Sequence, residues 1–261
     1  DDSMTFQSTP LVRANHAHEA WQAILTWAAS KAAAADLLEF PRLATEGPVH
    51  HALIDVLYAR NVLSYSVDSY TRPMLTTKAA NGATYMERVI SAYSRRKLRQ
   101  KRNNLRKLGT LSARKLEADA DFANWVDTFL KMEAEGWKGR EGTAMLVAGQ
   151  DAYFRTICRE AFERGRLHML ALFLDDRPIS MLCGFVAKEG EYLFKLAYDE
   201  AHARYSPGAL LQLDNIDEWH GRQNIAWQDS CATPKSTMLY QLWGERRTIG
   251  HVLIAPGSRY G

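Results

Sequence analysis

The sequence of 261 residues predicts a mixed α/β fold, and 46% hydrophobic residues are enough for substantial cores. Short aliphatic and aromatic runs alternate with longer helical patterns along the chain. Three of these runs, 167–174, 179–187 and 192–198, follow one another closely, as strands of an antiparallel meander do. The last run leads through a short loop into a helix whose start carries Ser206 and Pro207, a capping residue and a favoured first residue.

The first third of the chain predicts a small region of its own. The expected elements are a helix at 20–35, an apolar run at 37–40 closed by Pro41, a helix at 51–58 and a strand at 62–70. A polar stretch at 76–84 contains Asn81-Gly82, a turn signal and a plausible boundary. We therefore expect one domain at 1–80 and a second at 81–261.

The second region predicts a longer and more regular series. The expected elements are a long helix or helix pair at 85–108 stopped by Gly109, a strand at 111–116, helices at 122–135 and 152–164, the three-stranded meander, a helix at 206–221, a strand at 225–228, a helix at 237–243 and a strand at 249–254. In the helix at 122–135, Trp125, Phe129 and Met132 share one face.

The junction at 192–212 is a candidate anion site. The first turn of its helix presents unpaired backbone N–H groups and the positive end of the helix dipole, and Gly208 has no side chain to block an approaching phosphate. The alternative is an ordinary capped helix start, and the turn alone favours that alternative because most capped helices bind nothing.

Composition excludes several classes of protein. A net charge of +3, from 33 basic and 30 acidic residues, does not indicate a nucleic-acid-binding protein. No apolar run approaches the roughly 20 residues that cross a bilayer. The three cysteines lack metal-ligand spacing and suit a reducing cytoplasm, and His16 with His18 and His50 with His51 lack companion ligands. We therefore expect a cytoplasmic protein without a metal site.

A basic run at 95–107 stands out from the rest of the chain. Eight of its thirteen residues are Lys or Arg and none is acidic, while Leu98, Leu105 and Leu108 form an apolar seam. Such density is compatible with binding of tRNA or anionic lipid. No aromatic residue interleaves with the charges after Tyr93, so base stacking is not indicated. We favour a solvated helix face that contacts donor phosphates at most.

Three segments carry a resemblance to a known family. They are RRKLRQKRNNLRKLG at 95–109, EGWKGREGTAM at 135–145 and FKLAYDEAHARYSPGALL at 194–211. Together with the order of elements they resemble the GNAT acyltransferases, in the subfamily of CelD-type proteins of polysaccharide gene clusters. That group is related to the FemAB peptidyltransferases, which carry two GNAT-like domains in one chain.

The resemblance covers about residues 85–256. It implies a GNAT acyltransferase fold with a complete C-terminal domain. TPLV at 9–12 and LLEFPRL at 37–43 resemble the tail of a first copy. The resemblance thus implies that 1–80 is a partial or degenerate N-terminal GNAT-like domain, and that the chain begins inside it.

The resemblance implies a thioester donor, acetyl-CoA or another acyl-CoA. The pantetheine arm would pair with the strand before the capped helix, and the pyrophosphate would lie at the helix start. The implied donor-binding residues are Leu196, Ala197, Tyr198, Arg204, Ser206, Gly208 and Ala209. The family pattern Q/R-x-x-G-x-G/A is matched at its first and last positions, but Pro207 stands where the first glycine belongs. Because proline has no N–H, donor binding would be weakened, rearranged or replaced by another donor.

The same resemblance implies catalytic residues. Tyr240, on the helix after the next strand, occupies the position of the acid that protonates the departing thiolate. Asp199, with the neighbouring Glu200, and Asp229 follow strand ends and are candidate bases. A core tyrosine and ordinary capping carboxylates are the alternatives.

Three further residues are candidates for acceptor binding. Trp137 and Lys138 would lie over the acceptor side of the sheet, as an apolar or sugar-stacking wall and an anion contact; the alternative is a surface loop anchored by Trp137. Lys195 stands in an otherwise apolar strand, where an unpaired ammonium is costly, so it either pairs with Asp199 or Asp229 or contacts substrate.

The resulting hypothesis is an N- or O-acyltransferase that moves an acyl group from acyl-CoA to a sugar, amino sugar or related metabolite in polysaccharide or envelope biosynthesis. The alternatives are an aminoacyl-tRNA-dependent FemAB-like transferase and a non-catalytic GNAT-fold module of a biosynthetic complex. We expect a small-molecule or glycan acceptor, and a tRNA partner is the less favoured option.

Overall fold

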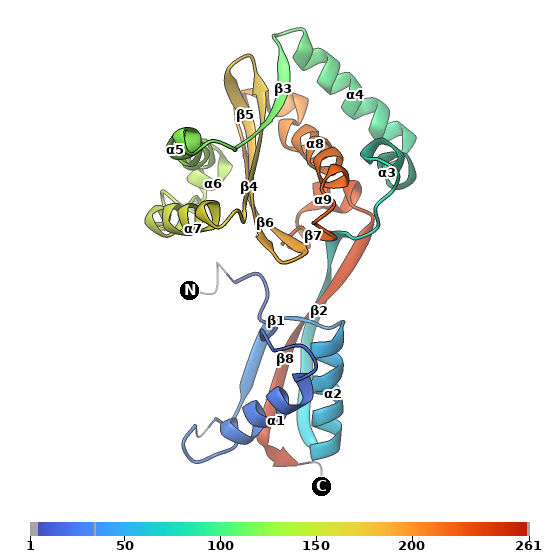
Figure 1. Cartoon of the computed structure of the whole chain (residues 1–261), viewed down its shortest axis with the longest axis vertical. Coiled ribbons are helices and arrows are strands. Elements are labelled where there is room, and N and C mark those ends of the chain that lie inside the picture. The colour runs from blue at the N-terminus through green and yellow to red at the C-terminus, as the bar shows by residue number, and fades with distance from the viewer. Residues whose placement is uncertain (1–4, 34, 260–261) are drawn as a thin grey trace. The chain divides into compact units, whose positions relative to one another are not determined.

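The chain forms two compact units in a computed structural model that describes residues 5–33 and 35–259 (Figure 1). The first unit comprises Asp1–Arg72, Thr233–Lys235 and Arg246–Gly261, and the second comprises Pro73–Ala232 and Ser236–Glu245. No helix among the described residues has the length and apolar character to cross a bilayer.

The first unit packs two helices against a small sheet. Its helices are α1 (Ala17–Ala28) and α2 (Pro48–Arg60), and its strands are β1 (Leu38–Ala44), most of β2 (Val62–Leu75) and most of β8 (Glu245–Arg259). The strand order is β1-β8-β2, with Leu38 of β1 opposite Ile254 of β8. Trp21 and Leu53 bring the two helices into one core, and the Trp21 indole N–H donates to the Val49 carbonyl at 2.8 Å.

The second unit is built on a larger sheet with the order β2-β7-β6-β5-β4-β3. Its strands are β3 (Leu111–Lys115), β4 (Leu167–Leu174), β5 (Arg177–Ala187), β6 (Gly190–Tyr198) and β7 (Trp227–Asp229), with the last residues of β2 at one edge. Only β6 and β7 run parallel; the other neighbours are antiparallel.

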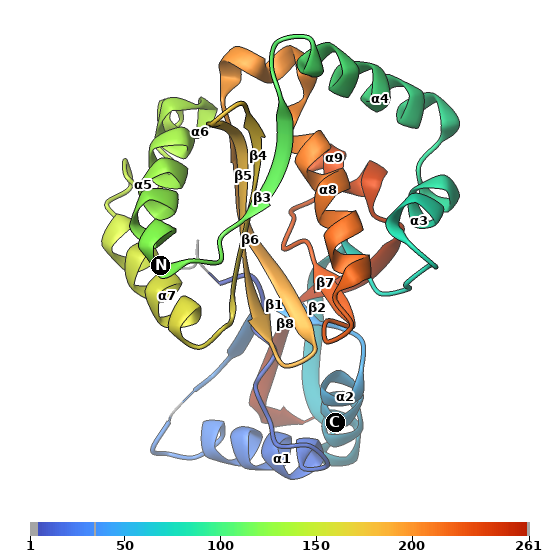
Figure 2. The ribbon, with the colours of Figure 1, turned by 45° about the horizontal axis from the view of Figure 1, so that its top comes forward.

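Helices cover both faces of this sheet (Figure 2). One face carries α5 (Asp119–Glu135), α6 (Trp137–Arg140) and α7 (Asp151–Glu163), and the other carries α3 (Gly82–Val89), α4 (Ala92–Arg106), α8 (Pro207–Gly221) and α9 (Thr237–Leu242). Leu210, Trp219 and Trp243 are fully buried in the core on the α8 side.

The pairing between β6 and β7 is short, and this positions the site. Gly190, Glu191 and Tyr192 of β6 pair with Trp227, Gln228 and Asp229 of β7. Beyond Tyr192, β6 continues to Tyr198 beside β5. The open edge of β6 therefore lies next to the start of α8, where a ligand can enter.

The expected order of elements is confirmed, with local corrections. The expected end of the apolar run 37–40 at Pro41 is wrong, because this run belongs to β1, which continues to Ala44 across a register shift between Phe40 and Leu43. The segment at 85–108 is two helices, since the Ser91 hydroxyl accepts from the Ser94 N–H at 3.2 Å and caps a new one.

The division into domains at 1–80 and 81–261 remains a prediction. The boundaries of the compact units differ from this division, because β8, which lies in the predicted second domain, belongs almost wholly to the first unit.

Candidate functional site

The junction between β6 and α8 contains a short helical segment. Asp199 follows the last residue of β6, and its carboxylate accepts from the Ala201 N–H at 2.9 Å, which caps a 3₁₀ helix at Glu200–Tyr205. Ser206 follows in the left-handed region with φ of 54°. Its hydroxyl does not cap α8, as the sequence had suggested, but accepts from the Lys101 ammonium at 2.5 Å.

The first turn of α8 faces the open edge of β6. Pro207 has no N–H, so the free donors of this turn are the N–H groups of Gly208 and Ala209. A Cβ on Gly208 would come within 3.1 Å of Leu196 Cδ2, so this glycine allows strand and helix to approach closely. The result is a short anion-compatible backbone surface with one donor fewer than the family pattern provides.

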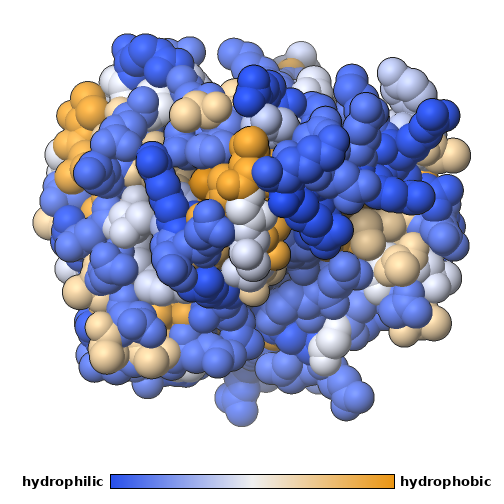
Figure 3. Space-filling model, turned by 90° about the horizontal axis from the view of Figure 1, so that it is seen from above, coloured by the Kyte–Doolittle hydropathy of each residue, from blue (hydrophilic) through white to orange (hydrophobic). Residues whose placement is uncertain are grey.

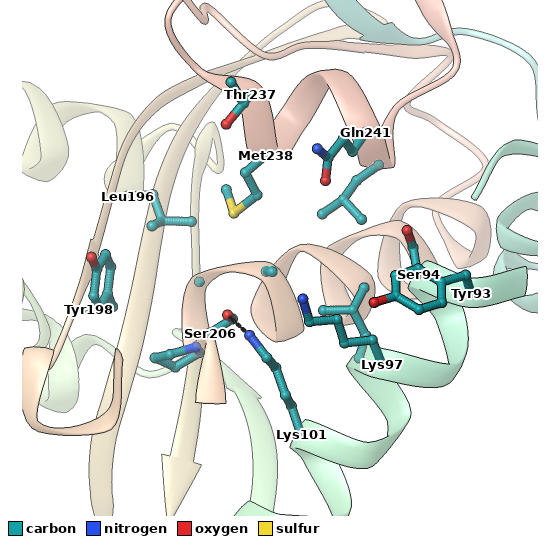
Figure 4. A pocket seen from close by; sticks show the side chains of 15 residues that line it. Tyr93, Ser94, Lys97, Lys101, Leu196, Tyr198, Ser206, Thr237, Met238 and Gln241 are labelled. Carbon is teal, nitrogen blue, oxygen red and sulfur yellow. Dashed lines mark hydrogen bonds between the residues drawn. The ribbon is translucent and has the colours of Figure 1, made fainter. Parts of the chain in front are cut away.

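A pocket of about 560 Å³ opens at this helix start, and we call it the α8 pocket (Figure 4). It is lined by Tyr93, Ser94, Lys97, Leu98, Lys101, Leu196, Tyr198, Ser206, Pro207, Gly208, Ala209, Thr237, Met238, Gln241 and Leu242. Lys97 and Lys101 reach into it from α4, while Met238 and Gln241 approach from α9. Its walls are largely apolar and its charges are positive.

The positive charge of the α8 pocket is concentrated at two lysines. Burial lowers the pKa of Lys101, and the nearby Lys97 ammonium lowers it further. None of the residues that line the pocket carries a carboxylate. An anion placed between these two ammonium groups would relieve their repulsion.

On the other face of β6 lies a buried cluster that the sequence did not predict. Glu133 of α5 accepts from Lys138 and from Lys195, each at 3.0 Å, and from the Met145 N–H at 3.0 Å. Of the two alternatives for Lys195, pairing with Asp199 or Asp229 is therefore wrong, and contact with substrate remains a prediction. A helical signal existed, because Glu133 lies three residues after Leu130, on the same buried face of α5.

The charges of this cluster are coupled. Burial raises the pKa of Glu133, but Lys138, the Met145 N–H and Lys195 outweigh it and leave the pKa below its usual value. Burial lowers the pKa of Lys138, against the opposing effect of Glu133. Lys138 also donates to the Leu196 carbonyl at 2.9 Å, which ties the cluster to the open end of β6.

A second pocket of about 570 Å³, which we call the α5 pocket, lies at the end of β6. It is lined by Thr128, Lys131, Met132, Glu135, Gly136, Arg177, Pro178, Tyr198, Asp199, Glu200 and Ala201. Tyr198 lines both pockets. The end of β6 is therefore the place where ligands of the two pockets would meet.

The candidate catalytic carboxylates have different surroundings. Asp199 lines the α5 pocket and contacts Arg177 at 2.9 Å and His202 at 3.3 Å. Asp229 is fully buried, and its carboxylate accepts from the Cys231 N–H at 2.8 Å. The structure thus brings Asp199, but not Asp229, to a pocket.

The remaining predicted site residues are distributed around the two pockets. Tyr240 is half-buried on α9, but that helix contributes Thr237, Met238, Gln241 and Leu242 to the α8 pocket. Arg204 is exposed and lies over the Tyr205 ring at 4.7 Å. Trp137 is 43% exposed, and its backbone N–H donates to Glu200 at 2.7 Å.

Of the predicted donor-side residues, Leu196, Tyr198, Ser206, Gly208 and Ala209 line the α8 pocket together. Ala197, the remaining strand residue, is buried, and its carbonyl accepts from the Ser180 hydroxyl at 3.0 Å.

A buried polar network lies in the paired region of β6 and β7, and no local sequence pattern predicts it. Glu191 accepts from Arg222 at 2.6 Å and from Gln228 at 3.0 Å, and it lies 2.5 Å from His168 Nδ1. Burial raises the pKa of Glu191, but His168 and Arg222 outweigh it and hold the pKa below its usual value. Since Glu191 and Gln228 are register partners, the network also joins the two strands through their side chains within the short paired region.

The three cysteines lie in the interior of the chain. Cys158, Cys183 and Cys231 are buried free thiols, and burial raises the pKa of Cys183 well above its usual value, so it is unreactive. Within the described residues there is no cluster of three His, Cys, Asp or Glu side chains able to hold a metal ion.

A family model described as an acetyltransferase (GNAT) domain matches residues 92–230, which is 139 of the 261 residues. The chain belongs to the GNAT acetyltransferase family. The match spans α4, the meander, the start of α8 and β7, and therefore includes most of both pockets. Its GNAT domain is of the acyltransferase type, with the mixed α+β fold predicted from the sequence.

Solved structures show the same fold across nearly the whole chain. FemX is 11% identical over 95% of this chain and 79% of its own, with a TM-score of 0.63. A conserved protein of unknown function from Bacteroides thetaiotaomicron VPI-5482 is 10% identical over 91% and 75%, with a TM-score of 0.60. L-PGS from Bacillus licheniformis is 12% identical over 97% and 77%, with a TM-score of 0.56.

No curated protein matches the chain. At these identities, the structural likeness shows the fold alone.

Proposed function

We propose that this GNAT domain is an N- or O-acyltransferase that takes its acyl group from acyl-CoA in the α8 pocket. The observation that carries the proposal is the convergence of an open strand edge, a helix start and two lysines, Lys97 and Lys101, on one pocket (Figure 4). An acyl-CoA needs each of these: apolar walls for its pantetheine arm and positive groups for its phosphates.

The donor fits the residues that line this pocket. The pantetheine arm would lie along Leu196 and Tyr198, opposite Met238. Its phosphates would meet the N–H groups of Gly208 and Ala209 together with Lys97 and Lys101. Arg204, which is exposed in the 3₁₀ helix before α8, would contribute a longer-range attraction.

The acceptor would approach from the α5 pocket. Its amine or hydroxyl attacks the thioester carbon beside Tyr198, a C–N or C–O bond forms, the C–S bond breaks, and the acceptor proton is transferred to the departing thiolate. We assign Asp199 as the proton acceptor because it lines this pocket at the end of β6. Asp229, as a second base, and Tyr240, as the acid, remain proposals from the family pattern.

Trp137 and Lys138 border the acceptor side, and both line a small recess next to Leu196. A half-exposed indole suits stacking on a sugar or amino sugar, which is the acceptor class that we propose, within polysaccharide or envelope biosynthesis. The Lys138 and Lys195 charges next to the strand would stabilise negative charge that develops on the acyl oxygen.

Two alternatives keep specific support. An aminoacyl-tRNA donor is supported by the fold likeness to FemX and by the basic α4. A non-catalytic module of a biosynthetic complex is supported by Pro207 at a glycine position of the family pattern. The three buried free thiols support a reducing compartment such as the cytoplasm.

The test is donor binding, measured by calorimetry with acetyl-CoA, coenzyme A and charged tRNA, with Gly208→Asp as the variant. We expect acetyl-CoA to bind the unmodified chain and to lose at least about tenfold in affinity in the variant, because a carboxylate would meet the phosphates. Gly221→Asp, at the other end of α8 where a Cβ meets open space, is the matched control. Undiminished affinity in a folded Gly208→Asp variant would rule out this donor site.

A further inference from the structure

The basic face of α4 holds more charge than a small donor can use. Arg95 pairs with Glu87 and Arg102 with Asp214, but Arg96 and Lys107 have no ion-pair partner in the described part of the chain. The eight positive charges at 95–107 also exceed the net charge of +3, so the rest of the chain is net acidic. Unpaired charge of one sign, concentrated on one element, indicates a partner of the opposite sign.

Basic residues of this segment lie both inside and outside the α8 pocket. Lys97 and Lys101 line the pocket, while Arg96 and Lys107 are exposed outside it. Lys107 directly follows the last residue of α4 and keeps helical backbone angles, so Arg96 and Lys107, eleven residues or about three helical turns apart, lie on the same side of the helix. The face drawn in Figure 3 is largely hydrophilic, with a few apolar patches.

The α4 helix of 15 residues is about 22 Å long, so its charges reach well beyond one nucleotide.

The start of α8 is suited to few phosphate oxygens. Pro207 removes one N–H at the first helical position, and Lys101 is already bonded to Ser206. The pyrophosphate of coenzyme A needs several donors at this point, whereas a single phosphodiester needs fewer. The pocket thus has an apolar wall that suits a pantetheine arm, but it offers phosphate fewer hydrogen-bond donors than the family pattern does.

We propose that the acyl donor is also presented by an acidic acyl carrier protein, which docks on the exposed basic face of α4 and inserts its phosphopantetheine arm into the α8 pocket. This inference rests on the proposed acyltransferase function. The carrier's thioester C–S bond breaks, the acyl carbon bonds to the acceptor nitrogen or oxygen, and the acceptor proton goes to the carrier's thiolate. The single phosphodiester lies at Gly208 and Ala209, and the carrier's carboxylates face Arg96 and Lys107.

A protein fits this face better than RNA does. Between Ser94 and Lys107, α4 has no aromatic side chain, and Tyr93 at the pocket rim is the single ring at its start. Single-stranded nucleic acid is held by stacking of its bases on aromatic side chains as well as by charge. An acidic protein surface can bind through charge without base stacking, and the exposed Arg96 and Lys107 supply that charge.

The test compares the dissociation constants of an acetylated acyl carrier protein, the same carrier without its arm, acetyl-CoA and an uncharged tRNA. We expect the acetylated carrier to bind at least about tenfold more tightly than the armless one. In the double variant Arg96→Glu/Lys107→Glu, the acetylated carrier should lose about tenfold or more, whereas acetyl-CoA should stay within about twofold. Arg164→Glu, an exposed arginine on the other face of the sheet, is the matched control and should change neither affinity.

The outcomes separate this inference from the function on which it rests. If acetyl-CoA binds but the carrier does not, or binds equally with and without its arm, the carrier proposal is wrong and the acyltransferase proposal stands. If tRNA binds in a manner sensitive to Arg96→Glu/Lys107→Glu while the carrier does not, the face serves RNA and the carrier proposal is again wrong. If no donor binds, the proposed function itself fails.

Discussion

At the scale of single residues, Glu133 is the group on which the acceptor side of β6 depends. It is the shared partner of Lys138 and Lys195, and its side chain is fully buried. Two ammonium groups that lose a shared carboxylate in a poorly hydrated site repel each other, and each then carries an uncompensated desolvation cost.

Replacing Glu133 with Gln should therefore be strongly destabilising. We expect a loss of about 3–5 kcal/mol in the free energy of unfolding, measured by urea denaturation. The matched control is Glu135→Gln, whose exposed pair with Lys131 at 3.8 Å should be worth less than about 1 kcal/mol. Equal effects of the two substitutions would contradict the role of Glu133.

The pH dependence of stability follows from the same residue. The pKa of Glu133 is lower in the folded state than its ordinary value of 4.5. Its contribution to the free energy of unfolding is therefore fully present above pH 4.5. The contribution is lost as the pH falls from about 4.5 through the lower pKa of the folded state, because the unfolded chain then binds the proton more readily.

We expect unfolding curves between pH 3 and 6 to show a steeper acid loss of stability for the unmodified chain than for Glu133→Gln. Identical slopes would show that Glu133 does not titrate differently on folding.

At the scale of elements, the polar network around Glu191 joins β6 and β7 within their short paired region. Glu191→Ala should leave Arg222 and His168 buried without their carboxylate and cost about 3–5 kcal/mol. Thermal unfolding would measure this, with Glu189→Ala in the preceding exposed turn as the control. A shift in melting temperature no larger than that of the control would contradict a structural role for the network.

The start of α8 gives a second prediction at this scale. Pro207→Gly restores an N–H at the first helical position, so coenzyme A should bind a few-fold more tightly while α8 becomes slightly less stable. Calorimetry compares coenzyme A, which carries a pyrophosphate, with phosphopantetheine, which carries a single phosphate. The affinity for coenzyme A should increase more, because its pyrophosphate can use the additional N–H. An equal change for both ligands would show that Pro207 does not limit pyrophosphate binding.

Elements defined by local sequence were predictable, and contacts between distant residues were not. The turn signals, helix stops and apolar periodicity gave the order of strands and helices, and Ser206-Pro207-Gly208 marked the start of α8. The partner of Lys195 lies 62 residues earlier on another helix, and no local pattern specifies such a pair. Likewise, the link from Lys101 to Ser206 spans 105 residues and replaced the expected cap.

At the scale of the whole molecule, each compact unit has a core of its own. Trp21, Leu53 and Ile254 belong to the core of the first unit, whereas all residues that line the α8 pocket belong to the second. Donor binding should accordingly depend on the packing of the second unit.

This separation can be tested with one substitution in each core. Leu53→Ala should cost about 2–5 kcal/mol in the first unit, because it leaves a cavity among fully buried side chains, but the affinity for acetyl-CoA should stay within about twofold. Leu211→Ala, fully buried in α8, should have a similar cost and should also weaken donor binding, since α8 carries the phosphate-binding turn. Thermal unfolding with and without acetyl-CoA measures both quantities. A tenfold loss of affinity in Leu53→Ala would show that the first unit also shapes the donor site.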